Sequence, residues 1–424
     1  MKICLISNLY PPYNRGGAEQ VVKNTVEGLL SRGHQVVVVT ARPLGGSDPL
    51  SVSPLSGGDE NTPPDKPACP VGREGQGRSR VYRFFPWNLF FYGHDYKYPA
   101  VIRFFWHIFD VFNIHSFFKV RAILKKEKPD VVHTHNLKGL GYLIPLAIRS
   151  LGLRHAHTLH DVQLVEPSGI IIKGEENSWR YNGWPVKFYT NINRRLFGSP
   201  QVVISPSKFL MEFYEKRGFF SQSKKIILPN PVIGIRNKES GIRNESVRGL
   251  NFLYLGQVEQ HKGVFILIEA FKILNSKLVI HNSKLQIVGT GSKLVEAKKL
   301  AADCPQIVFH GKAERGELPG IFNQADVVVV PSLCYENSPT VIFESFSFGV
   351  PVLASSIEGV AELIHDNENG WTFEAGNVEA LASKLQWCAS NPEKIKIMRL
   401  SALKSVEGLG LEAYLDKLLG FCYR

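Results

Sequence analysis

The sequence predicts an α/β protein built from two doubly wound, Rossmann-like domains that face each other across a cleft. A chain of 424 residues is too long for one ordinary hydrophobic core and fits two α/β domains. Its strand-like runs are continuously rich in Val and Ile, which is typical of parallel strands covered on both faces. These runs alternate with helical segments over the first half of the chain and again after residue 250, so two separate parallel sheets are expected.

The first domain is expected over residues 1–230. A strand at Lys2–Ser7 leads through a Pro- and Gly-containing loop to a helix from about Ala18 to Ser31, which Gly33 ends. Further buried strands are expected at residues 36–40, 130–133, 155–160 and 201–204. Residues 43–80 are rich in Pro and Gly and poor in apolar side chains, which predicts a long exposed loop.

The second domain is expected over residues 250–405, after a linker at 231–249 that contains a short tandem duplication. Its strands are expected at residues 252–255, 286–288, 307–310, 326–331 and 352–354. Residues 406–424 are expected to hold a C-terminal helix, from about Leu411 to Phe421, that crosses back to the first domain by analogy with similar folds.

Composition narrows the class of protein. A hydrophobic content of 44% excludes wholesale disorder, and the formal charge of +12 favours a phosphorylated ligand, an anionic lipid surface or nucleic acid as partner. The six cysteines are scattered, which indicates neither zinc nor disulfides and favours a reducing compartment. The apolar stretch after Lys2 is too short for a signal peptide, and charged residues interrupt the most apolar window, 101–120, so no membrane span is expected.

Gly16 and Gly17 lie between the first strand and the first helix. A helix N-terminus offers free N–H groups and a positive dipole to a phosphate, and glycines allow the ligand to approach the backbone closely. The motif differs from the G-x-G-x-x-G fingerprint, so a nicotinamide enzyme is disfavoured. The alternative is a tight turn with no ligand.

His160 and Asp161 follow a predicted strand, where side chains of a parallel sheet reach the ligand. His133 and His135 end the preceding strand. Five histidines on two adjacent strands could indicate a metal, but strand alternation sends His133 and His135 to one face, while His155 and His157 lie back along their strand. We therefore expect no metal site. We expect His133, His135 and Asp161 to contact the residues that touch the substrate, or to pack in the core.

The second domain contains two further motifs. Lys262 opens a helix after a strand and a Gly-containing loop, where it could neutralise a diphosphate leaving group or simply be a solvated lysine. Glu336 and Glu344 bracket a loop and the first turns of a helix. Glu344 could accept both ribose hydroxyl protons, and Glu336 could bind sugar hydroxyls beside the helix-start amides. A glycosidase-like carboxylate pair is the rival interpretation.

Together, Gly16-Gly17-x-Glu19, Thr158-x-His160, the Gly256…Lys262-Gly263 loop and Glu336-x7-Glu344 resemble the family-four retaining glycosyltransferases, which have the GT-B fold. The similarity spans nearly the whole chain and is weakest over 43–120 and 220–248. It implies that the first domain binds the acceptor and the second a UDP- or GDP-sugar. It also implies retention of anomeric configuration, with the departing phosphate accepting the acceptor's proton.

The resemblance also implies residue roles. Gly17, and with it Gly16, would face the donor diphosphate, and Lys262 would bind the phosphates. His160 would lie at the reacting sugar as the catalytic residue, Glu336 would bind the sugar and Glu344 the ribose. Amides along the phosphates and a glycine near the base complete the donor site: Ser338, Thr340, Val341 and Gly289.

Two departures from the family pattern keep an alternative open. Many relatives have Arg where this chain has Gln257, and Pro339 stands where relatives often have Gly, which removes an N–H donor. The alternative is a non-catalytic GT-B protein that binds a nucleotide-sugar or glycan, with a sugar-nucleotide epimerase as a third hypothesis. No Asp-x-Asp pair is present to clamp a metal–diphosphate, so we expect no metal cofactor.

The segment from Arg80 to Lys128 is both aromatic and basic, with nine Lys or Arg against three Asp or Glu. This combination suits an anionic membrane surface, so we expect a cytoplasmic protein bound peripherally to the inner face of the membrane, acting on a glycan or lipid-linked acceptor. Alternatively, Phe104, Ile108, Phe112 and His115 form a core-facing helical stripe. Nucleic acid is not expected as a partner, because no binding module accompanies the charge.

Overall fold

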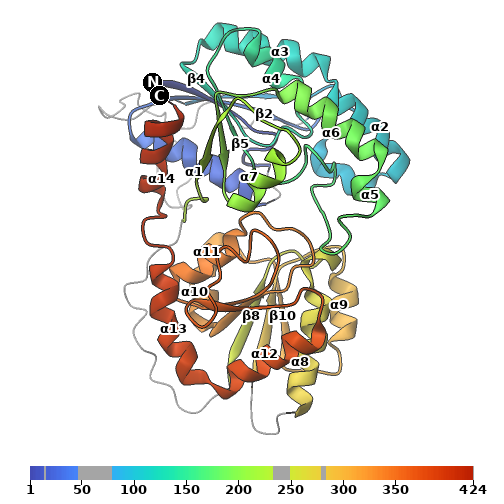
Figure 1. Cartoon of the computed structure of the whole chain (residues 1–424), viewed down its shortest axis with the longest axis vertical. Helices are drawn as coiled ribbons and strands as arrows, with labels where there is room; N and C mark the ends of the chain where they lie inside the picture. The colour runs from blue at the N-terminus through green and yellow to red at the C-terminus, as the bar shows by residue number, and fades with distance from the viewer. Residues whose placement is uncertain (14–15, 46–78, 233–248, 278–282, 424) are drawn as a thin grey trace, which may run out of the picture.

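The computed structural model describes residues 1–13, 16–45, 79–232, 249–277 and 283–423. They form two lobes, each built on one parallel sheet (Figure 1). The predicted fold class, two doubly wound α/β domains, is confirmed. Both chain ends lie on the same lobe, because the chain returns to the first lobe after completing the second (Figure 1).

The N-terminal lobe has a seven-stranded sheet in the order β3-β2-β1-β4-β5-β6-β7, with every pairing parallel. Its strands are β1 (Lys2–Ile6), β2 (Gln35–Ala41), β3 (Ser79–Phe84), β4 (Val131–Thr134), β5 (His155–Thr158), β6 (Val202–Ser205) and β7 (Lys224–Ile227). Its helices are α1 (Gly17–Ser31), α2 (Ala100–Val111), α3 (Ile114–Glu127), α4 (Ile144–Arg149), α5 (Trp179–Asn182), α6 (Trp184–Phe197) and α7 (Lys208–Glu215), with a 3-10 turn at Tyr92–Lys97.

The C-terminal lobe has a six-stranded parallel sheet in the order β10-β9-β8-β11-β12-β13. Its strands are β8 (Asn251–Leu255), β9 (Lys284–Val288), β10 (Ile307–Gly311), β11 (Val327–Val330), β12 (Val352–Ser355) and β13 (Gly370–Phe373). Its helices are α8 (Val264–Lys277), α9 (Leu294–Leu300), α10 (Leu318–Gln324), α11 (Thr340–Ser347), α12 (Val378–Ser390) and α13 (Pro392–Lys404), with 3-10 turns at Gln260–Lys262 and Arg315–Glu317.

The continuous apolar runs serve two cores at once. In β1, Cys4 and Ile6 join the cluster under α3, α4 and α6, whereas Ile3 and Leu5 join the cluster under α1. Successive side chains of a strand point to opposite faces, so a strand covered on both sides must be apolar at every position. The same division occurs in the C-terminal lobe, where neighbouring β11 valines belong to different clusters.

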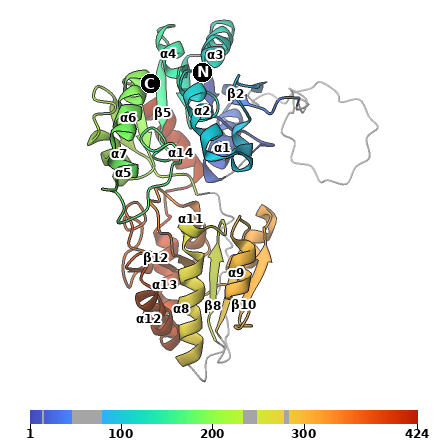
Figure 2. The same ribbon diagram turned by 90° about the vertical axis from the view of Figure 1, so that its right-hand side faces the viewer.

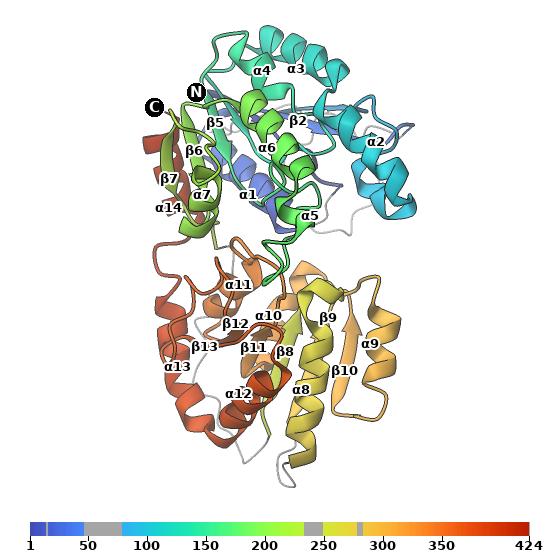
Figure 3. The same ribbon diagram turned by 45° about the vertical axis from the view of Figure 1, so that its right-hand side comes forward.

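Sheet order fixes where a ligand can bind. In each sheet the strand order reverses beside the first strand, between β1 and β4 in one lobe and between β8 and β11 in the other. Loops that leave two strands in opposite directions open a crevice at the carboxyl ends of those strands, which is where doubly wound sheets bind ligands. Both crevices face the junction between the lobes (Figures 1 and 3).

After α13 the chain crosses to the N-terminal lobe as α14 (Leu411–Lys417), followed by a π-helical turn at Leu418–Cys422. Leu415 is fully buried against α1, where a Cβ on Gly28 would come within 2.4 Å of the Leu415 side chain. Arg32 pairs with Glu412 and with Asp416 at the surface. This return helix ties the two lobes together through the end of the chain.

We expect Leu415→Ala to lower the free energy of unfolding by about 2–5 kcal/mol, because it removes a buried side chain and leaves a cavity between α14 and α1. Urea denaturation of the wild type and the variant measures the difference. Lys417→Ala, at an exposed position of the same helix, is the matched control and should change stability little. Equal effects of the two substitutions would contradict the packing described here.

Three expectations from the sequence need comment. Most of the predicted exposed loop at 43–80 and most of the linker at 231–249 lie outside the described residues, and β3 begins within the loop's last residues. The prediction of a core-facing stripe along α2 is wrong, because Phe104, Ile108 and Phe112, the residue after the helix, are 62%, 43% and 48% exposed. In the described part of the chain, no helix is both long and apolar enough to cross a membrane.

Candidate active site

A cavity of about 420 Å³ lies between the two lobes, at the crevices that the sheet order creates. Loops after β1, β5, β8 and β11 supply its walls. Ten of the residues predicted from the sequence line this one cavity: Gly16, Gly17, His160, Asp161, Gln257, Lys262, Glu336, Ser338, Thr340 and Val341. Residues up to 325 positions apart in the chain are therefore brought to one place by the two sheets.

Two helix N-termini meet at this cavity. Helix α1 begins at Gly17 and α11 begins at Thr340, and a Cβ on Gly17 would lie 3.0 Å from the Thr340 side chain. The first amides of both helices have no partner within their own helices, and both dipoles direct positive potential toward the cavity. Glu19 accepts a hydrogen bond from the Gly16 N–H at 2.9 Å, which fixes the glycine turn. The arrangement suits a diphosphate.

Lys262 and Glu336 form an ion pair at 2.6 Å on the wall that faces these helix ends. Burial opposes the charge on Lys262, but the neighbouring Glu336 carboxylate outweighs it, so the pKa of Lys262 is raised and the ammonium stays charged. Ser332 also donates to the same Glu336 oxygen at 2.8 Å. Gly263, at φ 73°, lets the Lys262 turn approach Pro331, whose carbonyl oxygen would be 1.7 Å from any Cβ there.

Glu344 lines an adjoining cavity of about 230 Å³ that shares Gly16, Gly17 and Thr340 with the first. Burial raises the pKa of Glu344, and the charge of Arg315, on the opposite wall, lowers it in part. A carboxylate one helical turn beyond the α11 N-terminus is well placed to accept protons from two neighbouring hydroxyl groups. The two cavities together could accommodate a ribose next to a diphosphate.

Binding of a ribonucleoside diphosphate to these cavities is expected to weaken as the pH falls through the raised pKa of Glu344, because only the ionised carboxylate accepts both ribose protons. The onset should come at a higher pH than for an exposed glutamate. Titration calorimetry with a panel of ribonucleoside diphosphates between about pH 5 and 8 measures it. The phosphates of these probes titrate as well, so Glu344→Gln is the control: it should lose affinity at neutral pH and keep only the ligand's own pH dependence.

Gln257 and Gly289 occupy different positions relative to the cavity. Gln257 is exposed in it, and its backbone carbonyl accepts from the Tyr254 hydroxyl at 2.5 Å. Gly289 does not line the cavity, but it lies directly behind Gly256, whose carbonyl oxygen would be 1.8 Å from a Cβ on Gly289. Its φ of 143° also excludes other side chains. Gly289 therefore allows the β8 and β9 loops to meet.

His160 is partly exposed at the cavity wall and lies 2.9 Å from His135, ring nitrogen to ring nitrogen. Burial lowers the pKa of His160 to about 4, so the imidazole is neutral at physiological pH. A neutral imidazole held by one nitrogen can present the other to a substrate hydroxyl as donor or acceptor. Asn337, from the other lobe, donates its side-chain amide to the His160 carbonyl at 3.2 Å.

Behind His160, a chain of buried rings runs away from the cavity. The ring of His135 lies tilted against that of His133, with the ring centroids 4.2 Å apart. The two ring nitrogens of His133 are each 2.7 Å from a hydroxyl oxygen, one of Tyr423 and one of Thr158. Neither His133 nor His135 lines the main cavity. Tyr423 belongs to the C-terminal segment. The returning chain end therefore supports His160 from the side away from the cavity, through His133 and His135.

Asp161 lies beside His160 and accepts from Asn136 at 3.2 Å and from the Gln163 N–H at 2.9 Å. Burial raises the pKa of Asp161 to about 6, with these hydrogen bonds opposing the shift. Among the described residues no group of three or more His, Cys, Asp or Glu side chains is arranged to hold a metal ion.

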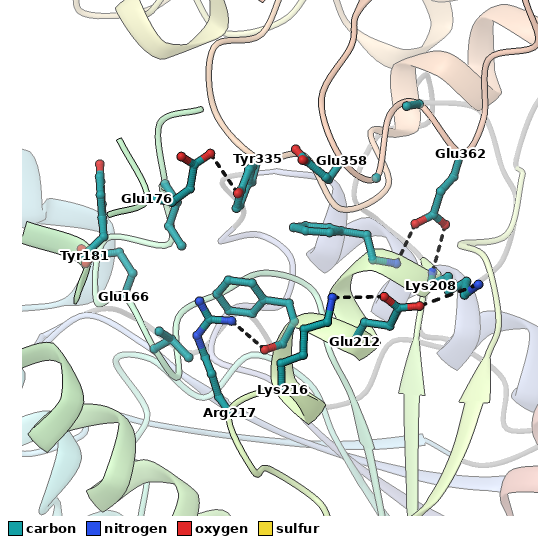
Figure 4. Close-up of a pocket in the computed structure, with 16 residues that line it drawn as sticks. Glu166, Glu176, Tyr181, Lys208, Glu212, Lys216, Arg217, Tyr335, Glu358 and Glu362 are labelled. Carbon is teal, nitrogen blue, oxygen red and sulfur yellow. Dashed lines mark hydrogen bonds and ion pairs between the residues drawn. The ribbon is translucent and has the colours of Figure 1, made fainter. Parts of the chain in front are cut away.

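A third hollow, of about 540 Å³, is lined by residues of both lobes, among them Tyr335, Glu176 and Glu362 (Figure 4). Tyr335 lines both cavities and donates its hydroxyl to Glu176 at 3.0 Å. Glu362 of the C-terminal lobe accepts from the Lys208 and Phe209 amides at the start of α7, at 3.0 and 2.6 Å. These contacts hold the lobes together beside the site.

Backbone pairing adds to this junction. Ile172 and Cys334 form an isolated antiparallel bridge, flanked by hydrogen bonds from Lys173 to Leu333 and from Tyr335 to Ile171, each 2.9 Å. The loop that carries Glu336 is thus held by the N-terminal lobe. Sequence analysis missed Tyr335 and Asn337, although both lie within the motif that contains Glu336, because their partners are in the other domain.

Two facing parallel-sheet domains, with helix N-termini and a lysine converging on the cavity between them, define an enzyme that binds a phosphorylated substrate at a domain junction. The chain belongs to the family-4 glycosyltransferases. The model described as Glycosyltransferase Family 4 matches residues 15–233, and the model described as Glycosyl transferases group 1 matches residues 236–404. The protein is a glycosyltransferase of the GT-B fold.

Curated relatives include a protein from a cps region and a named galactosyltransferase. An uncharacterized 42.6 kDa protein in the cps region of Klebsiella pneumoniae is 24% identical over 86% of this chain and 87% of its own length. The UDP-Gal:alpha-D-GlcNAc-diphosphoundecaprenol alpha-1,3-galactosyltransferase of Escherichia coli is 26% identical over 72% of this chain and 77% of its own length.

Solved structures share the fold. Sucrose-phosphate synthase from Thermosynechococcus elongatus has a TM-score of 0.70 at 19% identity and covers 100% of this chain and 98% of its own. Anabaena HepE in complex with UDP has a TM-score of 0.65 at 15% identity over 99% of both chains.

Proposed function

We propose that this enzyme transfers a hexose from a nucleotide-sugar to a glycan or lipid-linked acceptor, with retention of configuration and without a metal. The observation that carries the proposal is the convergence of two helix N-termini and the charged Lys262 on one cavity between the lobes. That convergence is what a diphosphate leaving group requires.

The donor is a UDP- or GDP-sugar in this proposal, and a UDP-sugar is favoured. The relative in Escherichia coli is named for UDP-Gal, and Anabaena HepE was solved with UDP and with UDP-glucose. The diphosphate lies between Gly17 and the Thr340 and Val341 amides, with the ribose hydroxyls on Glu344. The hexose then extends toward Glu336 and His160.

The chemistry is one substitution at the anomeric carbon. The bond from this carbon to the diphosphate oxygen breaks on the same face on which the bond to the acceptor oxygen forms, and the acceptor's proton passes to the departing phosphate. Lys262 and the two helix N-termini stabilise the negative charge that develops on the diphosphate. Neutral His160 orients a hydroxyl of the transferred sugar, which reduces the motion needed to reach the transition state.

The acceptor is a glycan or lipid-linked sugar that meets the enzyme at the cytoplasmic face of the membrane. The named relatives are a galactosyltransferase acting on a diphosphoundecaprenol-linked sugar and a lipopolysaccharide N-acetylglucosaminetransferase of Salmonella typhimurium, the latter 30% identical over 40% of this chain and 48% of its own length. The exposed apolar face of α2 and the basic residues of α3 support peripheral binding to an anionic membrane.

The test is acceptor-dependent release of UDP or GDP from a panel of nucleotide-sugars, with and without EDTA, followed by NMR of the product's anomeric configuration. We expect release that EDTA does not change and a product with the donor's configuration. Glu336→Gln should lose the acceptor-dependent release of nucleotide, whereas Glu368→Gln, at an exposed position in the same lobe, should keep it. Nucleotide binding with no transfer to any acceptor would favour a non-catalytic binding protein instead, and an inverted product would contradict the mechanism.

A further inference from the structure

One buried ring nitrogen behind the donor cavity, Nε2 of His135, calls for an explanation. His135 is fully buried, and its other nitrogen, Nδ1, lies 2.9 Å from Nε2 of His160. Within the residues that the structure describes, Nε2 of His135 has no hydrogen-bond partner. Most buried polar side-chain atoms in proteins are paired, so an unpaired one carries information about the groups around it.

The ring of His135 is held independently of its contact with the donor site. The backbone N–H of His135 donates to the Ile6 carbonyl at 2.9 Å, which fixes the residue at the end of β4. The ring lies against that of His133, whose two nitrogens are engaged by hydroxyl groups of Thr158 and Tyr423. Figure 2 shows the C-terminal end of the chain, near Tyr423, on the lobe that contains β5. The ring of His135 is therefore packed in one orientation.

The rings of His135 and His160 are both neutral at physiological pH. Burial lowers the pKa of His160 to about 4 and places the pKa of His135 well below its usual value. A neutral imidazole carries one proton, on one of its two nitrogens. The contact between the two rings therefore has two possible arrangements. Either Nδ1–H of His135 donates to Nε2 of His160, or Nε2–H of His160 donates to Nδ1 of His135.

The unpaired Nε2 of His135 distinguishes these two arrangements. If His160 donates, the single proton of His135 must be on Nε2, which leaves a buried N–H group without an acceptor. If His135 donates, Nε2 carries only an unused lone pair. Buried N–H groups without an acceptor are rarer in folded proteins than acceptors with an unused lone pair. The arrangement in which His135 donates is therefore favoured, and the proton of His160 is then on Nδ1.

We propose that His135 is a positioning residue that holds His160 in the Nδ1–H tautomer, so that His160 donates a hydrogen bond to an oxygen of the transferred sugar. His160 lines the donor cavity and His135 occupies its Nε2, which leaves Nδ1 for the ligand. A donor at this place needs a lone pair on the sugar, which a hydroxyl, an acetamido carbonyl or a carboxylate supplies. The contact with the sugar rests on the proposed function, whereas the tautomer does not.

The kinetic test uses two substitutions of matched shape. Asn and Leu both branch at Cγ, as His does, but only Asn carries an N–H group there. His135→Asn can still donate to Nε2 of His160, whereas His135→Leu removes the donor and leaves a side chain of similar size. His365→Leu, at an exposed position in the C-terminal lobe, is the control and should keep wild-type activity.

We expect kcat of His135→Leu to be about tenfold or more below that of His135→Asn, which corresponds to the loss of one hydrogen bond at the reacting sugar. Thermal stabilisation by UDP should be the same in the two variants, because UDP lacks the sugar that His160 would contact. Equal kcat values in His135→Asn and His135→Leu would overturn the proposal, because they would show that His135 acts through its shape alone.

The tautomer itself can be read by NMR of the full chain labelled with ¹⁵N-histidine, without substrate. His160→Gln removes the His160 signals and thereby identifies them among the 13 histidines of the chain. We expect the proton of His160 on Nδ1 in the wild type, and a share of it on Nε2 in His135→Leu. A proton on Nε2 of His160 in the wild type would overturn the proposal.

Failure of this inference and failure of the proposed function are separable, because the tautomer is measured on the enzyme alone. Sugar transfer by a wild type whose His160 carries its proton on Nε2 would reject this inference and leave the proposed function intact. An Nδ1–H tautomer in a protein that transfers no sugar to any acceptor would reject the proposed function alone.

Discussion

Replacing Lys262 by alanine should lower kcat/KM for the nucleotide-sugar by about 10²- to 10³-fold, or about 3–4 kcal/mol of transition-state stabilisation. Lys262 is the basic side chain that the cavity places opposite the ends of α1 and α11. In the proposed mechanism its charge neutralises a diphosphate that becomes more negative as the glycosidic bond breaks. The larger part of the loss should therefore appear in kcat.

The same substitution leaves Glu336 without its partner at 2.6 Å, so two effects must be separated. Lys262→Arg keeps the charge with different geometry and should recover part of the activity. Lys272→Ala removes a lysine of the same lobe that pairs with Asp303 far from the cavity, and it should be neutral. Wild-type kcat in Lys262→Ala would show that this lysine is a solvated helix-start residue, the alternative that the sequence left open.

His160→Ala should reduce kcat by about 10²-fold or more, because loss of one orienting contact at the reacting sugar misplaces the anomeric carbon. The effect on binding of UDP alone should be small, since UDP lacks the sugar that His160 contacts in the proposed mechanism. His365→Ala, an exposed histidine in the C-terminal lobe, is the control. Comparable loss in both variants would contradict a specific role for His160.

The pH profile gives an independent check. The pKa of His160 is about 4, so the ring is neutral above about pH 5 and its titration should not limit activity at higher pH. The rate should then fall only in acid, as His160 is protonated and its ring can no longer accept a hydrogen bond. A rate that rises with a pKa near 6.5, and loses this rise in His160→Ala, would mean that the histidine acts as a general base, against the mechanism proposed here.

Strands buried on both faces were predictable, whereas of the four edge strands only β10 was predicted, at residues 307–310. The continuous apolar runs of β1, β2 and β11 favour buried strands, whereas β7 begins with two lysines and is largely exposed. β13 reads Gly-Trp-Thr-Phe, too short a pattern to identify. Helix α2 misleads for a physical reason: its apolar stripe resembles a core-facing helix, yet most of it is exposed. Periodicity does not tell which partner covers an apolar face.

Much of the candidate site was visible because its residues lie in local motifs at strand ends. The spacing around Gly17, His160, Lys262 and Glu336 identifies each segment, and the two sheets then bring these segments together. Contacts between distant segments were not predictable. The hydrogen bond between Tyr423 and His133 spans 290 positions, and no local pattern marks a tyrosine near the chain end as a support for histidines.

The most direct measurement is thermal stabilisation of the wild type by UDP, GDP, ADP and their sugars, with and without EDTA. One nucleotide class should raise the unfolding midpoint, to the same extent with EDTA, and Glu344→Ala and Lys262→Ala should each reduce the rise. Such a result would place the donor in the cavity between the lobes and name its base. The donor site would be contradicted if no nucleotide shifted the unfolding midpoint at millimolar concentration. It would also be contradicted if both variants showed the same shift as the wild type.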